Sequence, residues 1–392
     1  MSVTIDGASF ARRCKVTINS SEVNGTPTGF PIVIPRSKLP DEMFDSDGSY
    51  STQSDGRDVR AAANNDATGR LAMFVDGWAI DADPANGTGT IYCANPGIAS
   101  SGDVDIWIFY DSATATTPAV DSTYGQEAVF DAGVLNYYTM SVAATGNQTD
   151  KTGTGLDLTA TGSPTSVDGQ IGKAIEFNNG TTGQKYASTS TTGVNGNATL
   201  YADILVKRLD TSPSSSFESY LYITDTVSND AALIMYHEDS PKEWKSYLQT
   251  STTGYTYNTY NGLLDTSWHL MSARYDGSTH KLYVDGVERA SASATGTIVG
   301  SNGLIHIGDG QSTNRSANCQ IDDVMLGRLN CDPTCTHCTG PDSNQCLICV
   351  SGYLDQGSCI TACPNSRPYV ESYEVPFNLA THIVKECVAQ CN

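Results

Sequence analysis

The sequence predicts an all-β protein, and three observations lead to that prediction. Apolar residues occur in short runs, often in alternation, and Gly, Asp, Asn and Pro separate these runs. The chain holds 20 Tyr, 9 Phe and 4 Trp, which supply aromatic bulk for cores although hydrophobic residues make up only 39% of it. No long amphipathic helical run occurs in the sequence. Short strands joined by many tight turns account for all of these features.

At 392 residues the chain is too long for one ordinary hydrophobic core, so we expect two or three domains. Strand patterns and cysteine density divide it into residues 1–131, 132–329 and 330–392. We expect a β-sandwich of unknown function in the first segment, a jelly roll in the second and a small disulfide-rich domain in the third.

The first segment opens with a strand pattern. In RRCKVTINSSEVNG, Cys14, Val16 and Ile18 alternate with polar residues, and an Asn-Gly turn follows. Further strand candidates are GFPIVIP, VDGWAID, GTIYCAN and VDIWIFYD. Cys93 lies in the third of these. A disulfide between Cys14 and Cys93 across two sheets is one expectation, and two buried free thiols are the alternative.

Residues 8–131 resemble a bacterial and viral domain family of unknown function that usually precedes laminin-G-like domains. The resemblance rests on ARRCKVTI, GFPIVIPRSKLPDEMFD, SDGRDVR and DIWIFYDSATATTPAV followed by YGQEAVFD. Residues 92–95 depart from it, because relatives have a Trp-containing strand there, and this leaves the pairing of Cys93 open. The family has no assigned catalytic residues, so the resemblance implies architecture alone.

The second segment contains a dense β-meander, WHLMSARYDGSTHKLYVDGVERA, at residues 268–290. Its Asp-Gly pairs at 276–277 and 285–286 tolerate the positive φ that primed hairpin turns require. Apolar and polar residues alternate through 281–284, so one face should meet a core. With LNYYTM before this meander and NGLIHIGDG and NCQIDDVMLGRL after it, the segment resembles a concanavalin-A-like, laminin-G-type jelly roll.

Nine cysteines crowd into residues 331–391, and CDPTCTHCTGPDSNQCLICVSGYLDQGSCITAC resembles a furin-like, growth-factor-receptor cysteine-rich repeat. So few large aliphatic residues cannot hold a fold by burial, and we expect disulfides to do so. Zinc bound by the two CxxC pairs near His337 is the less favoured alternative. Nine is an odd number of cysteines, and a disulfide from Cys319 into this tail would leave none of them unpaired. The cysteines expected in disulfides are Cys14, Cys93, Cys319, Cys331, Cys335, Cys338, Cys346, Cys349, Cys359, Cys363, Cys387 and Cys391.

Acidic residues outnumber basic ones by 43 to 22, which gives a net charge of −21. Such a surface repels nucleic acid and anionic membrane, so we expect neither as a partner. No apolar run reaches the ~18 residues that span a bilayer, and the first residues lack the apolar core of a signal peptide. The cysteines still indicate an oxidising environment. We expect an extracellular or virion-surface protein, placed there after removal of a leader or by release at lysis.

No catalytic signature emerges from the sequence. Glucanases with this fold use carboxylates at alternating positions of one strand, whereas the nearest acidic cluster, HEDSPKE, has Glu238 and Asp239 adjacent and a proline before Glu243. We interpret this cluster as a solvated loop. The six histidines form no Ser-His-Asp or Cys-His signature, and no Gly-rich phosphate loop is found. We expect no enzymatic activity.

Aromatic side chains supply the candidate glycan-binding residues. TGYTYNTYNG places Tyr255 and Tyr257 on one face of a strand, with Tyr260 close by. Aromatic faces stack on sugar rings, and Tyr236 and Trp244 are further candidates. The alternative is that all five are structural, since half-buried strand aromatics are common in β-sandwiches.

Calcium is the one cofactor that the sequence suggests. The resemblance to laminin-G-like jelly rolls implies a calcium ion held by Asp side chains and backbone carbonyls at a sheet edge. Asp322 and Asp323 are the candidate ligands. The resemblance also implies that the second acidic residue of this motif is mostly structural, so turns and caps are the alternative.

These features favour a non-catalytic surface recognition protein that binds glycans or cell-surface proteins by many weak contacts. A structural capsid or fibre component, whose jelly roll packs against neighbouring proteins of a virion or filament, is the alternative function. A polysaccharide-active glycoside hydrolase is the less favoured enzymatic alternative.

Overall fold

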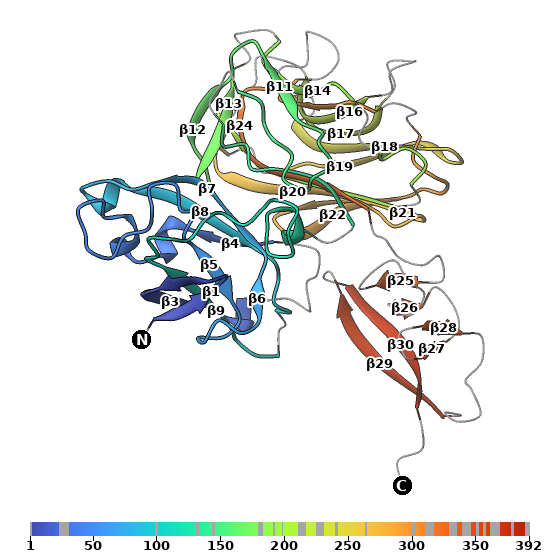
Figure 1. The fold of residues 1–392 in the computed structure, drawn as a ribbon. Coiled ribbons are helices and arrows are strands. Elements are labelled where there is room, and N and C mark those ends of the chain that lie inside the picture. Colours follow the sequence, from blue (N-terminus) through green and yellow to red (C-terminus); the bar gives the residue numbers. More distant parts are fainter. Residues whose placement is uncertain are drawn as a thin grey trace.

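The computed structural model of the chain is an all-β structure (Figure 1). It describes residues 2–22, 31–98, 101–130, 133–142, 146–178, 183–190, 193–197, 199–210, 217–224, 231–239, 242–262, 265–299, 303–309 and 317–328, and the backbone of strands between 335 and 388. The helical elements of the described chain are five short 3-10 turns, η1 (Ser20–Glu22), η2 (Arg36–Lys38), η3 (Asp41–Phe44), η4 (Pro84–Asn86) and η5 (Glu127–Val129). None of the described helices is long and apolar enough to cross a membrane. The predicted fold class is therefore confirmed.

Two small antiparallel sheets make up most of the N-terminal part, residues 2–130. One has the strand order β3-β9-β5-β6 and the other β4-β8-β7, and a separate hairpin joins β1 to β2. The strands are β1 (Val3–Ile5), β2 (Ala8–Phe10), β3 (Arg12–Ile18), β4 (Ile32–Pro35), β5 (Arg60–Ala62), β6 (Arg70–Leu71), β7 (Met73–Ala79), β8 (Thr88–Cys93) and β9 (Val104–Tyr110).

The two sheets share one hydrophobic core. Cys14, Val16 and Ile18 of β3 pack against it, as their alternation predicts, and Cys93 of β8 lies fully inside it. Cys14 and Cys93 are free thiols without a bridge between them, and Cys93 is buried whereas Cys14 is half-buried. Burial raises the pKa of each thiol to about 12, which keeps both sulfurs protonated and unreactive at neutral pH.

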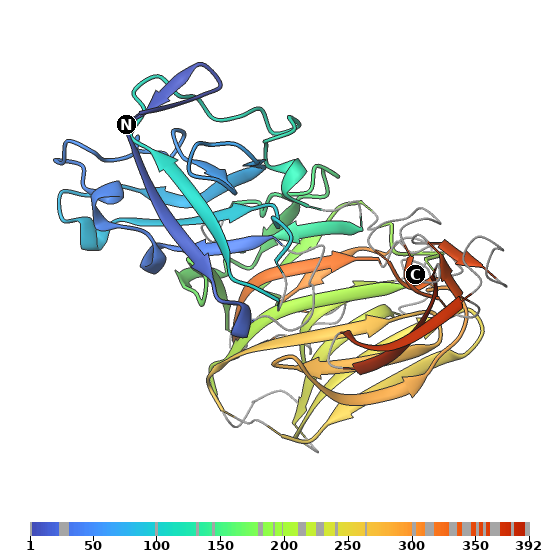
Figure 2. The same ribbon diagram turned by 90° about the horizontal axis from the view of Figure 1, so that it is seen from below.

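The jelly-roll part, residues 133–328, consists of two large antiparallel sheets, and Figure 2 shows the curvature of its long strands. The eight-stranded sheet has the order β12-β13-β24-β15-β20-β21-β22, with β10 also paired to β24. Its strands are β10 (Val134–Tyr138), β12 (Thr165–Asp168), β13 (Lys173–Phe177), β15 (Leu200–Arg208), β20 (Trp268–Tyr275), β21 (Thr279–Val284), β22 (Val287–Ser293) and β24 (Cys319–Gly327).

The seven-stranded sheet has the order β11-β14-β23-β16-β17-β18-β19. Its strands are β11 (Leu158–Thr161), β14 (Lys185–Ser188), β16 (Phe217–Thr224), β17 (Ala231–Asp239), β18 (Lys242–Thr250), β19 (Gly254–Tyr260) and β23 (Ile305–Ile307). Strands distant in the chain are thus neighbours in each sheet, and β24, near the end of this part, lies between β13 and β15.

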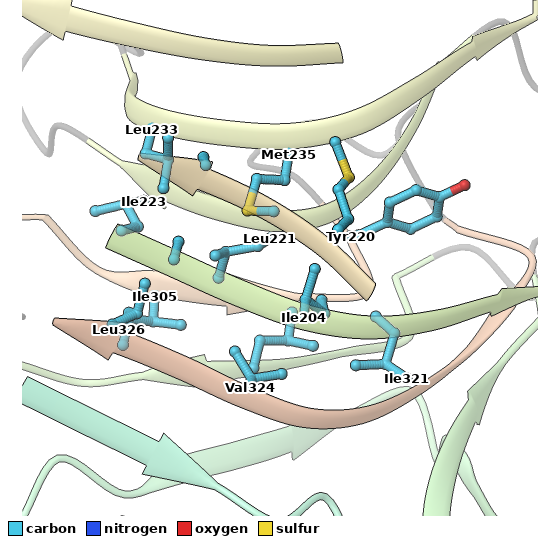
Figure 3. Packing of buried hydrophobic residues seen from close by; sticks show 14 of the residues in the cluster. Ile204, Tyr220, Leu221, Ile223, Leu233, Met235, Ile305, Ile321, Val324 and Leu326 are labelled. Atoms are coloured by element: carbon cyan, nitrogen blue, oxygen red, sulfur yellow. The ribbon is translucent and has the colours of Figure 1, made fainter. Parts of the chain in front are cut away.

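The main core lies between these two sheets. Figure 3 shows Leu221 and Met235 from the seven-stranded sheet packed toward Ile204 and Val324 from the eight-stranded sheet. All four side chains are fully buried, which removes about 25 cal/mol of unfavourable hydration per Å² of apolar surface. Cys319 is also a free thiol in this core, so the expected bridge from Cys319 into the tail is not formed.

The meander β20–β21–β22 turns at both Asp-Gly pairs, and positive φ occurs at both residues of 285–286 but only at the glycine of 276–277. Asp285 has φ +53° and Gly286 has φ +74°, while Gly277 in the preceding turn has φ +93°. These left-handed conformations are the ones that Asp-Gly pairs tolerate and most residues avoid. The turns fix the register in which Met271 pairs with Val284.

Six further strands follow in the C-terminal region. They are β25 (Cys335–Cys338), β26 (Cys346–Cys349), β27 (Tyr353–Asp355), β28 (Ser358–Ile360), β29 (Tyr369–Phe377) and β30 (Ala380–Val388). The side chains of residues 331–392 lie outside the described part of the structure. The disulfides of the nine cysteines there, and the zinc alternative, therefore stay predictions.

Candidate functional site

The outer face of the seven-stranded sheet carries exposed aromatic residues at its β19 edge. β19 is the last strand of that sheet, and its side chains alternate between core and solvent. Tyr255 and Tyr257 are 49% and 58% exposed, whereas Thr256 and Asn258 are buried. Among the described residues, Tyr257 is the most exposed large hydrophobic side chain. The predicted placement of Tyr255 and Tyr257 on one face is confirmed.

Tyr247 on β18 brings these two residues into one cluster. It pairs directly with Tyr257 across the ladder. Its ring centroid lies 5.1 Å from that of Tyr257, edge to face, and 5.4 Å from that of Tyr255. Tyr247 is buried, so it supports the two exposed rings from one side. We call Tyr247, Tyr255 and Tyr257 the tyrosine platform.

An amide group lies beside this platform. Gln249 pairs with Tyr255 across the ladder and follows Tyr247 by two residues, so it shares the outer face of β18. Its Oε1 atom is buried without a hydrogen-bond partner in the described part of the chain. An unpaired buried acceptor costs free energy, and a ligand hydroxyl would satisfy it.

A charged cluster lies on the same face, further along β18. Glu238 of β17 and Glu243 of β18 are direct cross-strand partners. Lys245 Nζ lies 2.7 Å from Glu243 Oε2 and also pairs with Glu238. The expectation of a solvated loop here is wrong, because β17 continues to Asp239 and β18 begins at Lys242, so both carboxylates belong to strands.

A buried histidine fixes the edge strands that carry the platform. His280 on β21 bonds through Nε2 to the Ser246 hydroxyl (3.0 Å) and through Nδ1 to the Thr256 hydroxyl (3.1 Å). Asn258 donates to the His280 carbonyl at 2.8 Å. Burial lowers the pKa of His280 to about 3, so the ring is neutral. These bonds tie β18 and β19 to the opposite sheet.

Trp244 is not part of the exposed surface, which corrects its candidacy as a glycan contact. It is fully buried in the main core. Its ring centroid lies 5.7 Å from that of Tyr220, 6.2 Å from that of His237 and 5.8 Å from that of His269. Adjacent residues of a strand point to opposite faces, so Trp244 faces the core and Lys245 faces outward.

Tyr236 and Tyr260 are also mainly structural. Tyr236 is on the outer face but only 5% exposed, and its ring stacks on Phe217 at 4.1 Å. Tyr260 is half-buried and packs against the main core, with the Arg289 guanidinium 4.6 Å from its ring centroid. The structure therefore brings together two of the five predicted aromatic residues as accessible rings.

Asp322 and Asp323 lie at a bulge in β24, where Asp323 has φ +20°. The Asp322 carboxylate accepts hydrogen bonds from the backbone N–H groups of Ile171 (2.7 Å) and Asp323 (2.9 Å). The Tyr92 hydroxyl, from the N-terminal part, donates to Asp323 at 3.3 Å. Both carboxylates are buried where the two parts of the chain meet.

This environment favours the protonated carboxyl groups. Burial raises the pKa of Asp322 to about 7. Burial, followed by the charge of Asp322, raises the pKa of Asp323 well above its usual value, while hydrogen bonds from Tyr137 and Tyr92 oppose that rise. Within the described residues, no group of three or more His, Cys, Asp or Glu side chains is placed to hold a metal ion. The contacts agree with the structural alternative, and calcium stays a prediction.

Sequence reasoning missed Tyr247, Gln249 and Lys245. Their signal was present, because EWKSYLQ places the three at alternating positions of one strand. The same strand contains Trp244, a large aromatic residue on the opposite face, and the sequence favoured it as the candidate. A single strand cannot say which of its faces meets the core, because partner strands decide that.

One family model matches within the jelly-roll part. Residues 178–328 match the Laminin_G_3 family model, described as the concanavalin A-like lectin/glucanases superfamily. No curated protein matches the sequence of the chain.

Several solved structures show a similarity to about half of the chain at low sequence identity. The binding domain of Paraclostridial Mosquitocidal Protein 1 is 13% identical, with 50% of this chain and 49% of that chain covered and a TM-score of 0.39. The botulinum neurotoxin serotype D binding domain is 10% identical, with 50% and 47% covered and a TM-score of 0.39. This chain thus spans about half the length of each.

Domain 4 of AbnA, a GH43 extracellular arabinanase from Geobacillus stearothermophilus solved with arabinotriose, is 16% identical, with 50% of this chain and 92% of that domain covered and a TM-score of 0.34. Together with the sheet topology, the family match identifies residues 178–328 as a concanavalin A-like jelly-roll domain.

Proposed function

We propose that this chain is a non-catalytic recognition protein that binds glycans through the tyrosine platform. The observation that carries the proposal is the pair of exposed rings, Tyr255 and Tyr257, held side by side on an edge strand. Exposed tyrosines offer an apolar face for the C–H groups of a sugar ring and a hydroxyl for its polar rim. Small-ligand sites commonly combine such aromatic surface with a few placed polar groups, and Gln249 is one here.

The carboxylates of the same face support binding more than hydrolysis. Glu238 and Glu243 both form ion pairs with the Lys245 ammonium. A glycosidase places its two carboxyl groups on either side of the scissile bond, whereas these two point at one shared ammonium group. The same groups can accept hydrogen bonds from ligand hydroxyls without any bond being broken.

We further propose that the chain acts outside a cell or on a virion, in three domains at residues 1–131, 132–329 and 330–392. The cysteine-rich third segment and the net charge of −21 support this location. A shallow platform of two rings gives weak individual contacts, so many copies on one particle would supply the affinity. The partners are glycans or glycosylated cell-surface proteins.

Substitution of the platform tests the proposed function. On a glycan array, followed by calorimetric titration of the best ligand, we expect Tyr257→Ala to weaken binding about tenfold or more, because a central aromatic contact is lost. Tyr50→Ala is the matched control, since Tyr50 is 46% exposed but lies in the N-terminal part.

Unchanged binding by Tyr257→Ala and Tyr255→Ala would contradict the proposal, as would an array without any saturable ligand. Repeating the titration with EDTA tests calcium at Asp322 and Asp323 separately from the platform. Release of reducing sugar from a polysaccharide, lost in Glu243→Gln, would replace the proposal with the hydrolase alternative.

A further inference from the structure

The charged cluster of Glu238, Glu243 and Lys245 gives the platform a second, polar end. All three side chains lie on the face that carries Tyr247. Lys245 and Glu243 precede Tyr247 on β18 by two and four residues, and Glu238 on β17 lies directly across from Glu243. Successive same-face residues of a strand are about 6.7 Å apart, so Glu243 lies about 13 Å from Tyr247. A single sugar ring is shorter than this distance.

The cluster carries more negative than positive charge. Two carboxylates share one ammonium group, and their side chains are only 32% (Glu238) and 10% (Glu243) exposed. Burial lowers the pKa of Lys245, but the hydrogen bonds to both glutamates raise it by more than that. The net shift is upward, so the ammonium stays charged. The cluster therefore has a net charge of about −1 in a partly desolvated position, where Coulomb repulsion of an anion is stronger than in water.

The two carboxylates also keep unused acceptor capacity. An ionised carboxylate offers about four lone-pair positions. Among the described residues, Lys245 is the one hydrogen-bonding partner of the Glu238 and Glu243 carboxylates. Hydroxyl groups donate to carboxylates in short, charge-assisted bonds. A ligand rich in hydroxyls and without charge fits these acceptors, and a ligand with its own carboxylate or sulfate does not.

We infer that this face selects neutral oligosaccharides, longer than one ring and extended along β18, over anionic glycans. One end of the ligand stacks on the tyrosine platform, and the other end donates hydroxyls to Glu238 and Glu243. The inference rests on the proposed function and adds to it the charge class, the minimum length and the orientation of the ligand. The net charge of −21 on the whole chain acts in the same direction.

Paired titrations test this inference. The full chain is titrated with neutral oligosaccharides of increasing length, and with carboxylated and sulfated oligosaccharides of matched length, at low and at moderate salt. We expect neutral ligands to bind at least tenfold tighter than their anionic counterparts at low salt, with a smaller ratio as salt screens the repulsion. Affinity should rise beyond the monosaccharide.

A charge-neutral substitution isolates the carboxylates. Glu243→Gln should weaken neutral ligands several-fold and reduce the discrimination against anionic ones. Glu238→Gln, at the more exposed position, serves the same purpose where Glu243→Gln disturbs folding. Glu288→Gln is the matched control, because Glu288 pairs with Lys281 at 3.1 Å on the other sheet. It should leave both ligand classes unchanged.

Four outcomes overturn the inference. Equal or tighter binding of anionic glycans, or an unchanged ratio in both glutamate variants, removes the charge selection while the proposed function stands, provided Tyr257→Ala still weakens binding. Full affinity for a monosaccharide removes the extended ligand. Binding of neither class removes the proposed function itself, and this inference with it.

Discussion

Arg208 and Glu218 form a fully buried ion pair that joins the two sheets of the jelly roll. Arg208 Nε lies 3.6 Å from Glu218 Oε2, and both side chains have no solvent exposure. Several of their polar atoms have no hydrogen-bond partner in the described part of the chain, and the two ring nitrogens of His237 nearby share that property. Burial raises the pKa of Glu218 to about 7, while the Arg208 charge opposes that rise. Buried ion pairs contribute little net stability, but removing one partner leaves an unpaired buried charge, which lowers the free energy of unfolding.

A double-mutant cycle tests this pair. Arg208→Met should lower the free energy of unfolding by about 3 kcal/mol, because it leaves Glu218 buried without its cation. Arg208→Met combined with Glu218→Leu should recover much of that loss, since no buried charge remains. Urea unfolding of the wild type and the variants measures both values. A double variant that is less stable than Arg208→Met alone would contradict this expectation.

Strands determine which residues reach the ligand face. Alternation predicted that Tyr255 and Tyr257 share one side of β19, and the Asp-Gly pairs predicted the hairpins of the meander. The side on which Trp244 lies was not predictable from β18 alone, because β18 has large residues on both of its faces. The burial of a face is set by strands that are distant in the chain. The local sequence therefore predicts which residues share a face of the strand, but not which face meets the core.

The same limit applies to Asp322 and Asp323. Their acidity suggested an exposed metal edge, but Asp323, at the bulge in β24, contacts Tyr92, more than two hundred residues earlier in the chain, and Asp322 accepts from Ile171. A contact of that sequence separation leaves no local signal. The free thiols follow the same logic, since strand patterns placed Cys14 and Cys93 in one core but did not decide whether they bond.

His280 is the element-scale test of how β18 and β19 are held. His280→Phe keeps the ring volume but leaves the Ser246 and Thr256 hydroxyls without their buried partner, which should cost about 1–3 kcal/mol. The loss should concentrate at the edge, so hydrogen exchange within 254–260 should accelerate more than exchange within 319–327 in β24. Glycan affinity should fall as well, because the platform loses its fixed geometry.

A uniform change in exchange over both strands would contradict this local role. His306→Phe is the control, since His306 is also buried in the jelly roll but its Nδ1 atom has no hydrogen-bond partner in the described part of the chain. It should leave the exchange of 254–260 close to that of the wild type.

At the scale of the whole molecule, a third hydrophobic cluster joins the N-terminal part to the jelly roll. Phe74 and Tyr92 of the N-terminal part stack at 4.7 Å, and the Tyr92 ring lies 5.9 Å from that of Tyr137 on β10. Lys151 Nζ lies 3.7 Å from the Asp76 carboxylate beside them. An interface that is aromatic, hydrogen-bonded and buried should make the two parts unfold together rather than independently.

Phe74→Ala tests that coupling, because it removes the central ring of the cluster without touching either main core. The wild type should unfold in calorimetry with the two parts in a single transition, and Phe74→Ala should separate it into two. Ile106→Val, which trims a fully buried residue of the N-terminal core, should lower the transition temperature and keep one transition. Two transitions already in the wild type would mean that the cluster packs the parts together without coupling their stability. One transition in Phe74→Ala would mean that the Tyr92–Asp323 hydrogen bond and the Lys151–Asp76 pair are enough to couple them.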